Sequence, residues 1–321
     1  MRFLVTGGAG FIGAYTKKSL LNKGYSVISF DNNSDLKLVR KVLSEREYER
    51  VLFIQGDISK YAEVSQLFLK HKIDRIIHLA FLLVPDSNQK PLLAIKVNCE
   101  GFAHLLEMTR KHGTKRIVFV SSVGVFGPQE KYPVIPIPND APHFPQSMYG
   151  ACKSLNEYLA NHYHHQYGLE IIGLRFSIVY GAFREHGQSS FVFRELIEKP
   201  TNHKKSKVPY GDDVIDWLYI KDAVRAILYA SIKPITKTRV FNVAGTLRPI
   251  QDAVKFIKNI YPSSKIVIKR GKIGIVWEFD SQKIRKELGF KPEFSLEQGL
   301  IDSLNIYRKS VGMDPISAKR R

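Results

Sequence analysis

The 321 residues are 44% hydrophobic and 25% charged, a composition typical of a globular protein and not of a disordered, fibrous or repetitive chain. No apolar run approaches the roughly 20 residues of a transmembrane helix and no secretory signal is recognisable, so no membrane partner is expected. Only two cysteines, Cys99 and Cys152, are present, which argues against a disulfide framework and predicts a cytoplasmic location. The net charge of +19 would attract anions, but the basic residues are scattered and match no nucleic-acid-binding motif, so nucleic acid is not expected as a partner.

Apolar runs alternate with helix-patterned segments through the first half of the chain. This alternation predicts parallel strands that are buried on both faces and joined by right-handed helical crossovers. The expected fold class is therefore α/β, with a doubly wound parallel sheet. The six runs are RFLVT (2–6), YSVISF (25–30), VLFIQGD (51–57), RIIHLAF (75–81), RIVFVSS (116–122) and IIGLRFS (171–177).

A glycine-rich turn follows the first run, with Gly7, Gly10 and Gly13 in the spacing GxxGxxG, and a helical pattern begins at Phe11 and Ile12. We expect Gly7 to allow the tight turn, Gly10 to let the backbone approach a pyrophosphate, and Gly13 to let helix and strand pack closely. The helix N-terminus then offers unpaired N–H groups to the anion. The turn therefore predicts a Rossmann dinucleotide site.

Asp31 directly follows the second run. A carboxylate at the end of that strand accepts hydrogen bonds from both adenosine ribose hydroxyls and repels the 2′-phosphate of NADP. NAD is therefore the expected cofactor, while the nearby Lys37 and Arg40 keep NADP as an alternative.

A second group of residues points to hydride-transfer chemistry. Ser122 ends the fifth run, and Tyr149 and Lys153 share one face of a later helical pattern. Lowering the pKa of a tyrosine from 10 to about 7 requires roughly 4 kcal/mol, and an ammonium about 4 to 5 Å away supplies roughly 3 to 4 kcal/mol. Tyr149 is thus the expected general acid/base toward a substrate hydroxyl, with Ser122 bonding the same oxygen and Lys153 holding the nicotinamide ribose.

The alternation lapses from about Phe183, where a segment rich in Lys, Pro, Gly and Asp begins. We predict an NAD-binding Rossmann domain over 1–182, with 212–245 returning to it. A smaller, discontinuous substrate-binding lobe is expected from 183–211 and 246–321. Within it, Asp280 is the expected N-cap of a helix that stops at Gly289.

At this point the sequence resembles the extended branch of the short-chain dehydrogenase/reductase superfamily, the NAD-dependent epimerase/dehydratases. The resemblance spans nearly the whole chain. It depends on TGGAGFIG (6–13), Asp31, GDIS (56–59), HLA (78–80), NCEGFAHLLE (98–107), SSVGVFG (121–127), YGACK (149–153), LRFSIVYG (174–181), DWLYIKD (216–222) and FNVAG (241–245).

The resemblance also implies roles for residues that spacing alone does not assign. It implies a homodimer formed through the helix that carries Tyr149 and Lys153 and the helix before it. The implied cofactor contacts are Phe11 and Ile12 at the pyrophosphate, Asp31 and Asn32 at the adenosine ribose, Asp57 and Ile58 at the adenine, Leu79, Ala80 and Phe81 along the cleft, Asn98 at a cleft position and Ser177 near the nicotinamide. No metal is expected.

Departures from the family pattern bear on the substrate. Ile178 and Ile215 replace the Asn and Arg that contact the substrate diphosphate in sugar-nucleotide members. Val123 and Gly124 replace an acidic pair of the dehydratases, so a 4,6-dehydratase is not expected. Arg184, with His186, offers replacement charge, although a solvent-facing loop is the favoured interpretation there.

The favoured function is an NAD-dependent oxidoreductase that transfers a hydride between NAD and a secondary alcohol or sugar-like small molecule. Loss of both diphosphate contacts motivates this choice. A nucleotide-sugar epimerase with tightly bound NAD is the alternative, because the same catalytic trio of Ser122, Tyr149 and Lys153 serves both reactions. A non-catalytic NAD-sensing or RNA-binding protein is a third hypothesis, against which the intact Ser122, Tyr149 and Lys153 argue.

Overall fold

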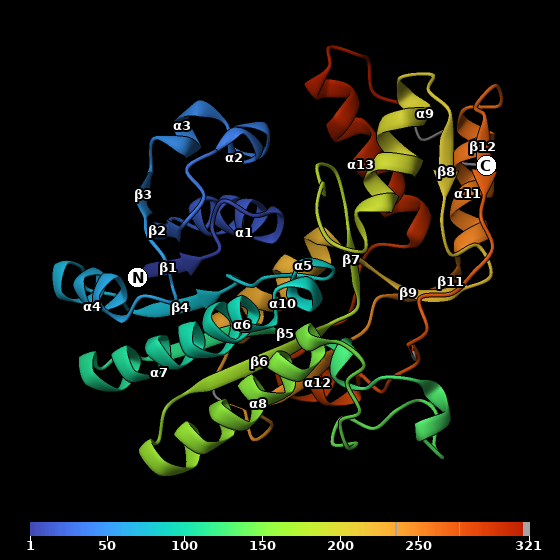
Figure 1. Ribbon diagram of the computed structural model, residues 1–321. Coiled ribbons are helices and arrows are strands. Elements are labelled where there is room, and N and C mark those ends of the chain that lie inside the picture. Colours follow the sequence, from blue (N-terminus) through green and yellow to red (C-terminus); the bar gives the residue numbers. More distant parts are fainter. Residues whose placement is uncertain (235, 276, 317–321) are drawn as a thin grey trace.

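The computed structural model describes residues 1–234, 236–275 and 277–316, and the end of the predicted lobe at 317–321 lies outside them (Figure 1). Its centre is a seven-stranded sheet in the order β10-β6-β5-β4-β1-β2-β3, in which every pairing is parallel. The strands are β1 Arg2–Thr6, β2 Ser26–Asp31, β3 Val51–Gln55, β4 Arg75–His78, β5 Arg116–Ser122, β6 Ile171–Phe176 and β10 Val240–Val243.

The predicted doubly wound parallel sheet is confirmed, and all six apolar runs form strands of it. Strands β3 and β4 end two and three residues before the ends of the predicted runs 51–57 and 75–81, at Gln55 and His78. The residues that follow them leave the sheet as loops at its carboxyl edge, where a parallel sheet of this type binds its ligands.

Alternate residues of the strands face two separate apolar layers. Phe3 and Val5 of β1 belong to the layer under α1 and α10, whereas Leu4 packs with α4, α7 and α8 on the other face (Figure 1). The helices are α1 Phe11–Asn22, α2 Lys37–Val42, α3 Glu45–Tyr48, α4 Tyr61–Lys70, α5 Asp86–Gln89, α6 Pro91–Ala94, α7 Gly101–His112, α8 Met148–Tyr167, α9 Lys199–Thr201, α10 Ile220–Ile232, α11 Ile250–Ile260, α12 Gln282–Leu288 and α13 Leu296–Ser310. Two π-helical segments, η1 Ile95–Glu100 and η4 Val192–Glu198, and two 3-10 turns, η2 Val123–Val125 and η3 Gln129–Lys131, complete the set.

Two smaller sheets lie beyond the carboxyl edge of the large one, beside α11 and α13 (Figure 1). The first has the order β11-β9-β7, with β7 Ile178–Tyr180, β9 Val214–Tyr219 and β11 Thr246–Pro249. The second pairs β8 Ser206–Val208 with β12 Ile266–Ile268. None of the helices in the described ranges is both long and apolar enough to cross a membrane.

The chain crosses between the large sheet and these smaller sheets several times. β10 pairs with β6 in the large sheet, and α12 contacts β10. Helix α12 has Ser281 as its N-cap, one residue after the predicted Asp280, whose side chain instead accepts a 2.7 Å hydrogen bond from the Gln282 amide. Gly289 ends the helix with a φ of 67°, as predicted.

Candidate active site

A concave site with a volume of about 580 Å³ lies at the carboxyl ends of β1, β2, β4 and β5. The structure brings nearly all the predicted site residues to its walls. The predicted residues that line it are Gly7, Gly10, Phe11, Ile12, Gly13, Asp31, Asn32, Asp57, Ile58, Leu79, Ala80, Phe81, Ser122, Tyr149 and Ser177. Two others, Asn98 and Lys153, lie behind this lining.

The glycine turn has the geometry that its sequence predicts at two positions. Gly7 has a φ of 70°, and a Cβ there would lie 2.4 Å from the backbone carbon of Leu79. A Cβ on Gly13 would lie 2.5 Å from the Gly7 carbonyl oxygen, so a side chain at either position would force the turn apart. Helix α1 begins directly after Gly10, and no side chain caps its first amides. The helix N-terminus therefore opens into the cavity with N–H groups free for an anion.

Asp31 stands at the end of β2 on the cavity wall. Its Oδ2 accepts a 2.8 Å hydrogen bond from the Ala9 amide, and its Oδ1 accepts a 2.9 Å bond from the Asn33 amide. These backbone donors hold the carboxylate between the glycine turn and the loop that follows β2. A phosphate-binding helix end with a fixed carboxylate at the neighbouring strand fits the pyrophosphate and the ribose of a dinucleotide.

Ser122 and Tyr149 meet on the same wall of the cavity. Ser122 is the last residue of β5, and its hydroxyl accepts a 3.0 Å hydrogen bond from the Gly124 amide and contacts the Tyr149 hydroxyl. Tyr149 lies in the first turn of α8, where the Ser147 side chain caps the helix by accepting a 3.0 Å bond from the Gly150 amide. The helix cap and the strand end thus fix the two hydroxyl groups relative to each other.

The expected fall of the Tyr149 pKa toward 7 is not found in this structure. Burial raises the pKa of Tyr149 to about 12, and the opposing effects of Arg184 and the Ser122 hydrogen bond are smaller. Lys153 is fully buried, and burial also holds its own pKa well below the ordinary value. Removal of both groups from water thus opposes the effect that the spacing of Tyr149 and Lys153 predicts.

Lys153 lies one helical turn beyond Tyr149, with its Nζ 5.2 Å from the centre of the Tyr149 ring. The same Nζ donates a 2.5 Å hydrogen bond to the carbonyl oxygen of Val120 and lies over the Phe81 ring. The Phe81 residue lines the cavity, whereas Lys153 does not. The structure therefore places Phe81 over the group that was expected to hold the nicotinamide ribose.

Asn98 is fully buried in η1 and holds the chain just beyond Phe81. Its Oδ1 accepts a 2.7 Å hydrogen bond from the Leu82 amide, and its Nδ2 donates a 3.1 Å bond to the Leu82 carbonyl. The Asn98 carbonyl in turn accepts a 2.8 Å bond from the Asn156 side chain of α8. Its contacts position the wall of the cleft from behind.

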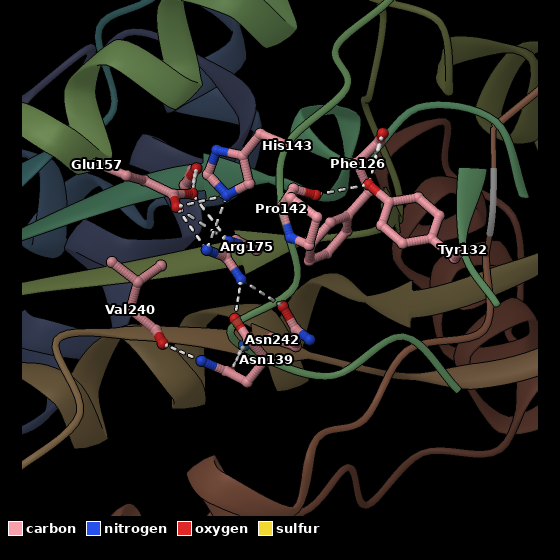
Figure 2. A network of polar contacts seen from close by, with 10 residues as sticks. Phe126, Tyr132, Asn139, Pro142, His143, Glu157, Arg175, Val240 and Asn242 are labelled. Carbon is pink, nitrogen blue, oxygen red and sulfur yellow. Dashed lines mark hydrogen bonds and ion pairs between the residues drawn. The ribbon is translucent and has the colours of Figure 1, made fainter. Parts of the chain in front are cut away.

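A buried ion pair between Glu157 of α8 and Arg175 of β6 supports the trio from behind (Figure 2). Arg175 Nη2 lies 2.6 Å from Glu157 Oε2, and the Ser121 hydroxyl donates a 2.5 Å hydrogen bond to the same carboxylate. Figure 2 shows His143 next to the pair, with its Nε2 3.4 Å from Glu157 Oε2. Because Ser121 precedes Ser122 and Glu157 lies one turn beyond Lys153, this network fixes β5 and α8 together. Sequence analysis did not single out Glu157 or Arg175.

The loop after β7 differs from the prediction that it faces solvent. Arg184 and Glu185 line the cavity, and Glu185 forms an ion pair with Lys41 of α2, the Nζ and Oε1 atoms being 3.4 Å apart. Arg184 Nε donates a 2.5 Å hydrogen bond to the Ser189 hydroxyl. Burial lowers the pKa of Arg184 to about 10, with Tyr149 close enough to oppose that shift. His186 also lines the cavity, although its side chain is exposed.

Ile178 and Ile215 are both buried in the sheet formed by β7, β9 and β11. Next to them, the Ser177 hydroxyl donates a 2.5 Å hydrogen bond to Asp216, whose carboxylate also accepts a 2.8 Å bond from the Gly245 amide. Burial raises the pKa of Asp216 to about 6. Ser177 therefore lines the cavity, whereas Ile178 and Ile215 are not among its lining residues.

Fold and site together define a dinucleotide-binding enzyme. Residues 3–244 match the NAD dependent epimerase/dehydratase family, and the chain belongs to that family. The chain is thus an NAD-dependent enzyme, and its relatives include proteins named as UDP-glucuronate 4-epimerase and UDP-glucose 4-epimerase.

Particular relatives are similar over almost their whole length. The UDP-glucuronate 4-epimerase of Thermodesulfobacterium geofontis is 31% identical, over 96% of this chain and 97% of the relative. A crystal structure of the UDP-glucose 4-epimerase of Thermotoga maritima with UDP-glucose is 31% identical, with a TM-score of 0.86 over 97% of this chain and 100% of that one. The UDP-glucose 4-epimerase of Thermus thermophilus, solved with NAD, is 25% identical, with a TM-score of 0.82 over 96% and 99% of the two chains.

Proposed function

We propose that this protein epimerises a nucleotide-linked sugar by oxidising and re-reducing one secondary hydroxyl, with NAD retained through the cycle. The observation that carries the proposal is the position of Arg184 on the cavity wall. Its guanidinium lies near Tyr149, and its side-chain hydrogen bond goes to the neutral Ser189. A partly buried cation in a cleft favours an anionic ligand group, and a nucleotide sugar carries a diphosphate. Relatives named as nucleotide-sugar 4-epimerases support the same choice.

The residues of the trio take complementary parts in this reaction. Bound NAD supplies the acceptor and donor of the hydride. Tyr149 takes the proton of the substrate hydroxyl and returns it after the sugar ring has turned. Ser122 bonds the same oxygen and keeps the tyrosine hydroxyl aligned, as its contact in the free protein indicates. Burial keeps the Tyr149 pKa at about 12 in the free protein, so the proton leaves only once further positive charge enters the cavity.

A net dehydrogenase acting on a small secondary alcohol is the second candidate. Ile178 and Ile215 favour it, because both positions are apolar and buried where sugar-nucleotide members carry diphosphate contacts. In this case Arg184 would bind an acidic group on the alcohol itself. The trio would work in the same way, but NADH would leave after each turnover.

The deciding experiment follows products and cofactor together. We expect purified protein to contain NAD after gel filtration and to convert UDP-glucuronate or UDP-glucose to its 4-epimer, as seen by proton NMR, with no net change in absorbance at 340 nm. Stoichiometric NADH formation with a secondary alcohol, and no epimer from either nucleotide sugar, would establish the dehydrogenase instead. Tyr167→Phe, at the exposed end of α8, is the matched active control.

We further propose a homodimer and a cytoplasmic location. Three large apolar side chains are exposed on α6 and α8, with Leu92 77%, Leu155 45% and Tyr158 65% accessible. Apolar side chains on adjacent helices favour a helix-to-helix contact with a second copy. The two cysteines are free and buried, which fits a reducing compartment. Light scattering of wild type and of Leu155→Glu tests the dimer.

A further inference from the structure

A buried lysine of α1 lies directly beneath the glycine turn. The side chain of Lys17 is 0% exposed, although a lysine is almost never fully buried unless an acid pairs with it. Its ammonium instead donates hydrogen bonds to two uncharged groups, a 2.7 Å bond to the carbonyl oxygen of Gly8 and a 3.1 Å bond to the Ser29 hydroxyl. The same Nζ lies 4.8 Å from the centre of the Phe53 ring of β3. The cost of burying this charge calls for a compensating role.

The hydrogen bond from Lys17 fixes one peptide group of the glycine turn. The Gly8 carbonyl and the Ala9 amide belong to the same peptide group, and the Ala9 amide donates a 2.8 Å hydrogen bond to Asp31 Oδ2. This peptide group is therefore held at its oxygen by the Lys17 ammonium and at its nitrogen by the Asp31 carboxylate. Hydrogen bonds in a chain polarise one another, so the lysine strengthens the bond that holds the expected ribose acceptor in place.

Packing around this peptide group joins the turn to β2. A Cβ on Gly8 would lie 2.1 Å from the Ser29 Oγ and 3.1 Å from the Ser29 Cβ, so the serine side chain packs directly against the turn. Because the Ser29 hydroxyl also accepts a hydrogen bond from Lys17, the side chain of α1, the turn and β2 meet at one point. Loss of the lysine would free the turn from the strand that carries Asp31.

The charge on Lys17 responds to what binds above it. Burial lowers the pKa of Lys17 to about 7, and the negative charge of Asp31 opposes this shift. The other groups that face the ammonium are uncharged: the Gly8 carbonyl from the turn, the Ser29 hydroxyl from β2 and the Phe53 ring from β3. A ligand that brings negative charge to the N-terminus of α1 favours the protonated lysine, so ligand binding and protonation reinforce each other.

We propose that Lys17 is a positioning residue of the cofactor site, which ties the glycine turn to β2 through Gly8 and adds positive charge beneath the pyrophosphate of NAD. Lys17 does not touch the ligand, because it is fully buried and is not among the residues that line the cavity. It acts through the Gly8–Ala9 peptide group and through its electric field. The inference concerns cofactor binding alone, so it holds whether the enzyme is an epimerase or a dehydrogenase.

The test measures the affinity of the full-length protein for ADP-ribose as a function of pH. ADP-ribose carries the pyrophosphate and the adenosine of NAD but lacks the nicotinamide, so the positive charge that would change the titration of Tyr149 does not enter. Copurified NAD is removed with charcoal, and calorimetry at constant ionic strength gives the Kd. We expect the Kd of the wild type to rise by about tenfold between about pH 6 and pH 9, since Lys17 loses its charge over this range.

Lys17→Met removes the charge and the donors but keeps a side chain of similar length. Its Kd should be about tenfold higher than that of wild type near pH 6 and should change little as the pH rises. Lys23→Met, at the exposed end of α1, is the matched control and should keep both the wild-type Kd and its pH dependence. A Kd raised by the same factor at every pH would make Lys17 a merely structural residue and overturn the proposal, as would equal Kd values.

A measurement on the wild type alone decides the matter if Lys17→Met does not fold. Calorimetry in buffers of different ionisation enthalpy gives the number of protons taken up when ADP-ribose binds. We expect uptake of about half a proton near pH 8, because the bound pyrophosphate draws a proton onto the lysine. Binding without proton uptake at this pH would refute the role of Lys17.

Discussion

The two halves of the active-site cavity are built in different ways. The cofactor half is formed by glycines, by backbone amides of the α1 N-terminus and by the Asp31 carboxylate. The amides of Ala9 and Asn33 hold this carboxylate in place. The reaction half is formed by side chains from β5, α8 and the loop after β7, among them Tyr149 and Arg184. Backbone cradles recognise a constant ligand, whereas side chains on loops adapt the same fold to different substrates.

The largest effect is expected from Tyr149→Phe, which changes the reaction half alone. Removal of the acid/base hydroxyl should lower turnover by about 10²- to 10⁴-fold, while bound NAD stays at the wild-type level. Turnover and NAD content are measured on the same preparation. Tyr167→Phe, at the exposed end of the same helix, should retain full activity. A Tyr149→Phe protein that turns over normally would refute the assigned acid/base.

Next in size is the effect of Glu157→Gln, which removes the carboxylate from the buried pair in Figure 2. Arg175 is then left buried with its charge uncompensated, and the free energy of unfolding should fall by about 3 to 5 kcal/mol. Urea denaturation measures the change. Glu100→Gln replaces an exposed acid and should leave the stability unchanged. A loss no larger than that of the control would show that the network does not fix α8 to β5.

Arg184→Gln is expected to have a smaller effect, which should again be confined to the reaction half. The loss of one charge-assisted contact to an anionic substrate group should lower kcat/KM by about 10- to 100-fold, mainly through KM. NAD content should not change. The exposed Arg194→Gln is the control of equal charge. If NAD content falls and KM does not, Arg184 belongs to the cofactor half.

Asp31→Ala is the converse experiment in the cofactor half. Loss of the ribose acceptor should reduce the preference for NAD over NADP by about tenfold and leave the substrate KM nearly unchanged. Cofactor titration by fluorescence measures both affinities. Asp86→Ala changes an exposed acid and should keep the wild-type preference. An unchanged preference in Asp31→Ala would mean that another group reads the ribose.

The smallest expected effect concerns the pH dependence of stability near Ser177. Burial raises the pKa of Asp216 from 3.8 to about 6, so the folded protein binds this proton more tightly than the unfolded chain. The contribution to stability is complete below about pH 4 and is lost as the pH rises through about 6. Asp216→Asn should therefore lose less stability than wild type between these pH values, as thermal melts will show. Identical pH profiles for the variant, wild type and Asp86→Asn would contradict the assignment.

Much of the fold and of the cofactor half was predictable from the sequence. The six strands, the conformation of Gly7 and the close packing at Gly13 follow from local patterns, because apolar runs and backbone requirements act within a few residues. The strand end at Ser122 and the helical spacing of Tyr149 and Lys153 predicted that these side chains act together, and Ser122 and Tyr149 do lie on one wall. The division into domains stays a prediction, since the chain passes repeatedly between the large sheet and the smaller ones.

Other properties arose only from the tertiary structure. Whether Arg184 faces solvent or the cavity, and whether the pKa of Tyr149 falls or rises, depends on how much water the surrounding chain excludes. The sequence alone therefore determined the cofactor class. Desolvation and long-range contact decided the charges that surround Tyr149 and Arg184.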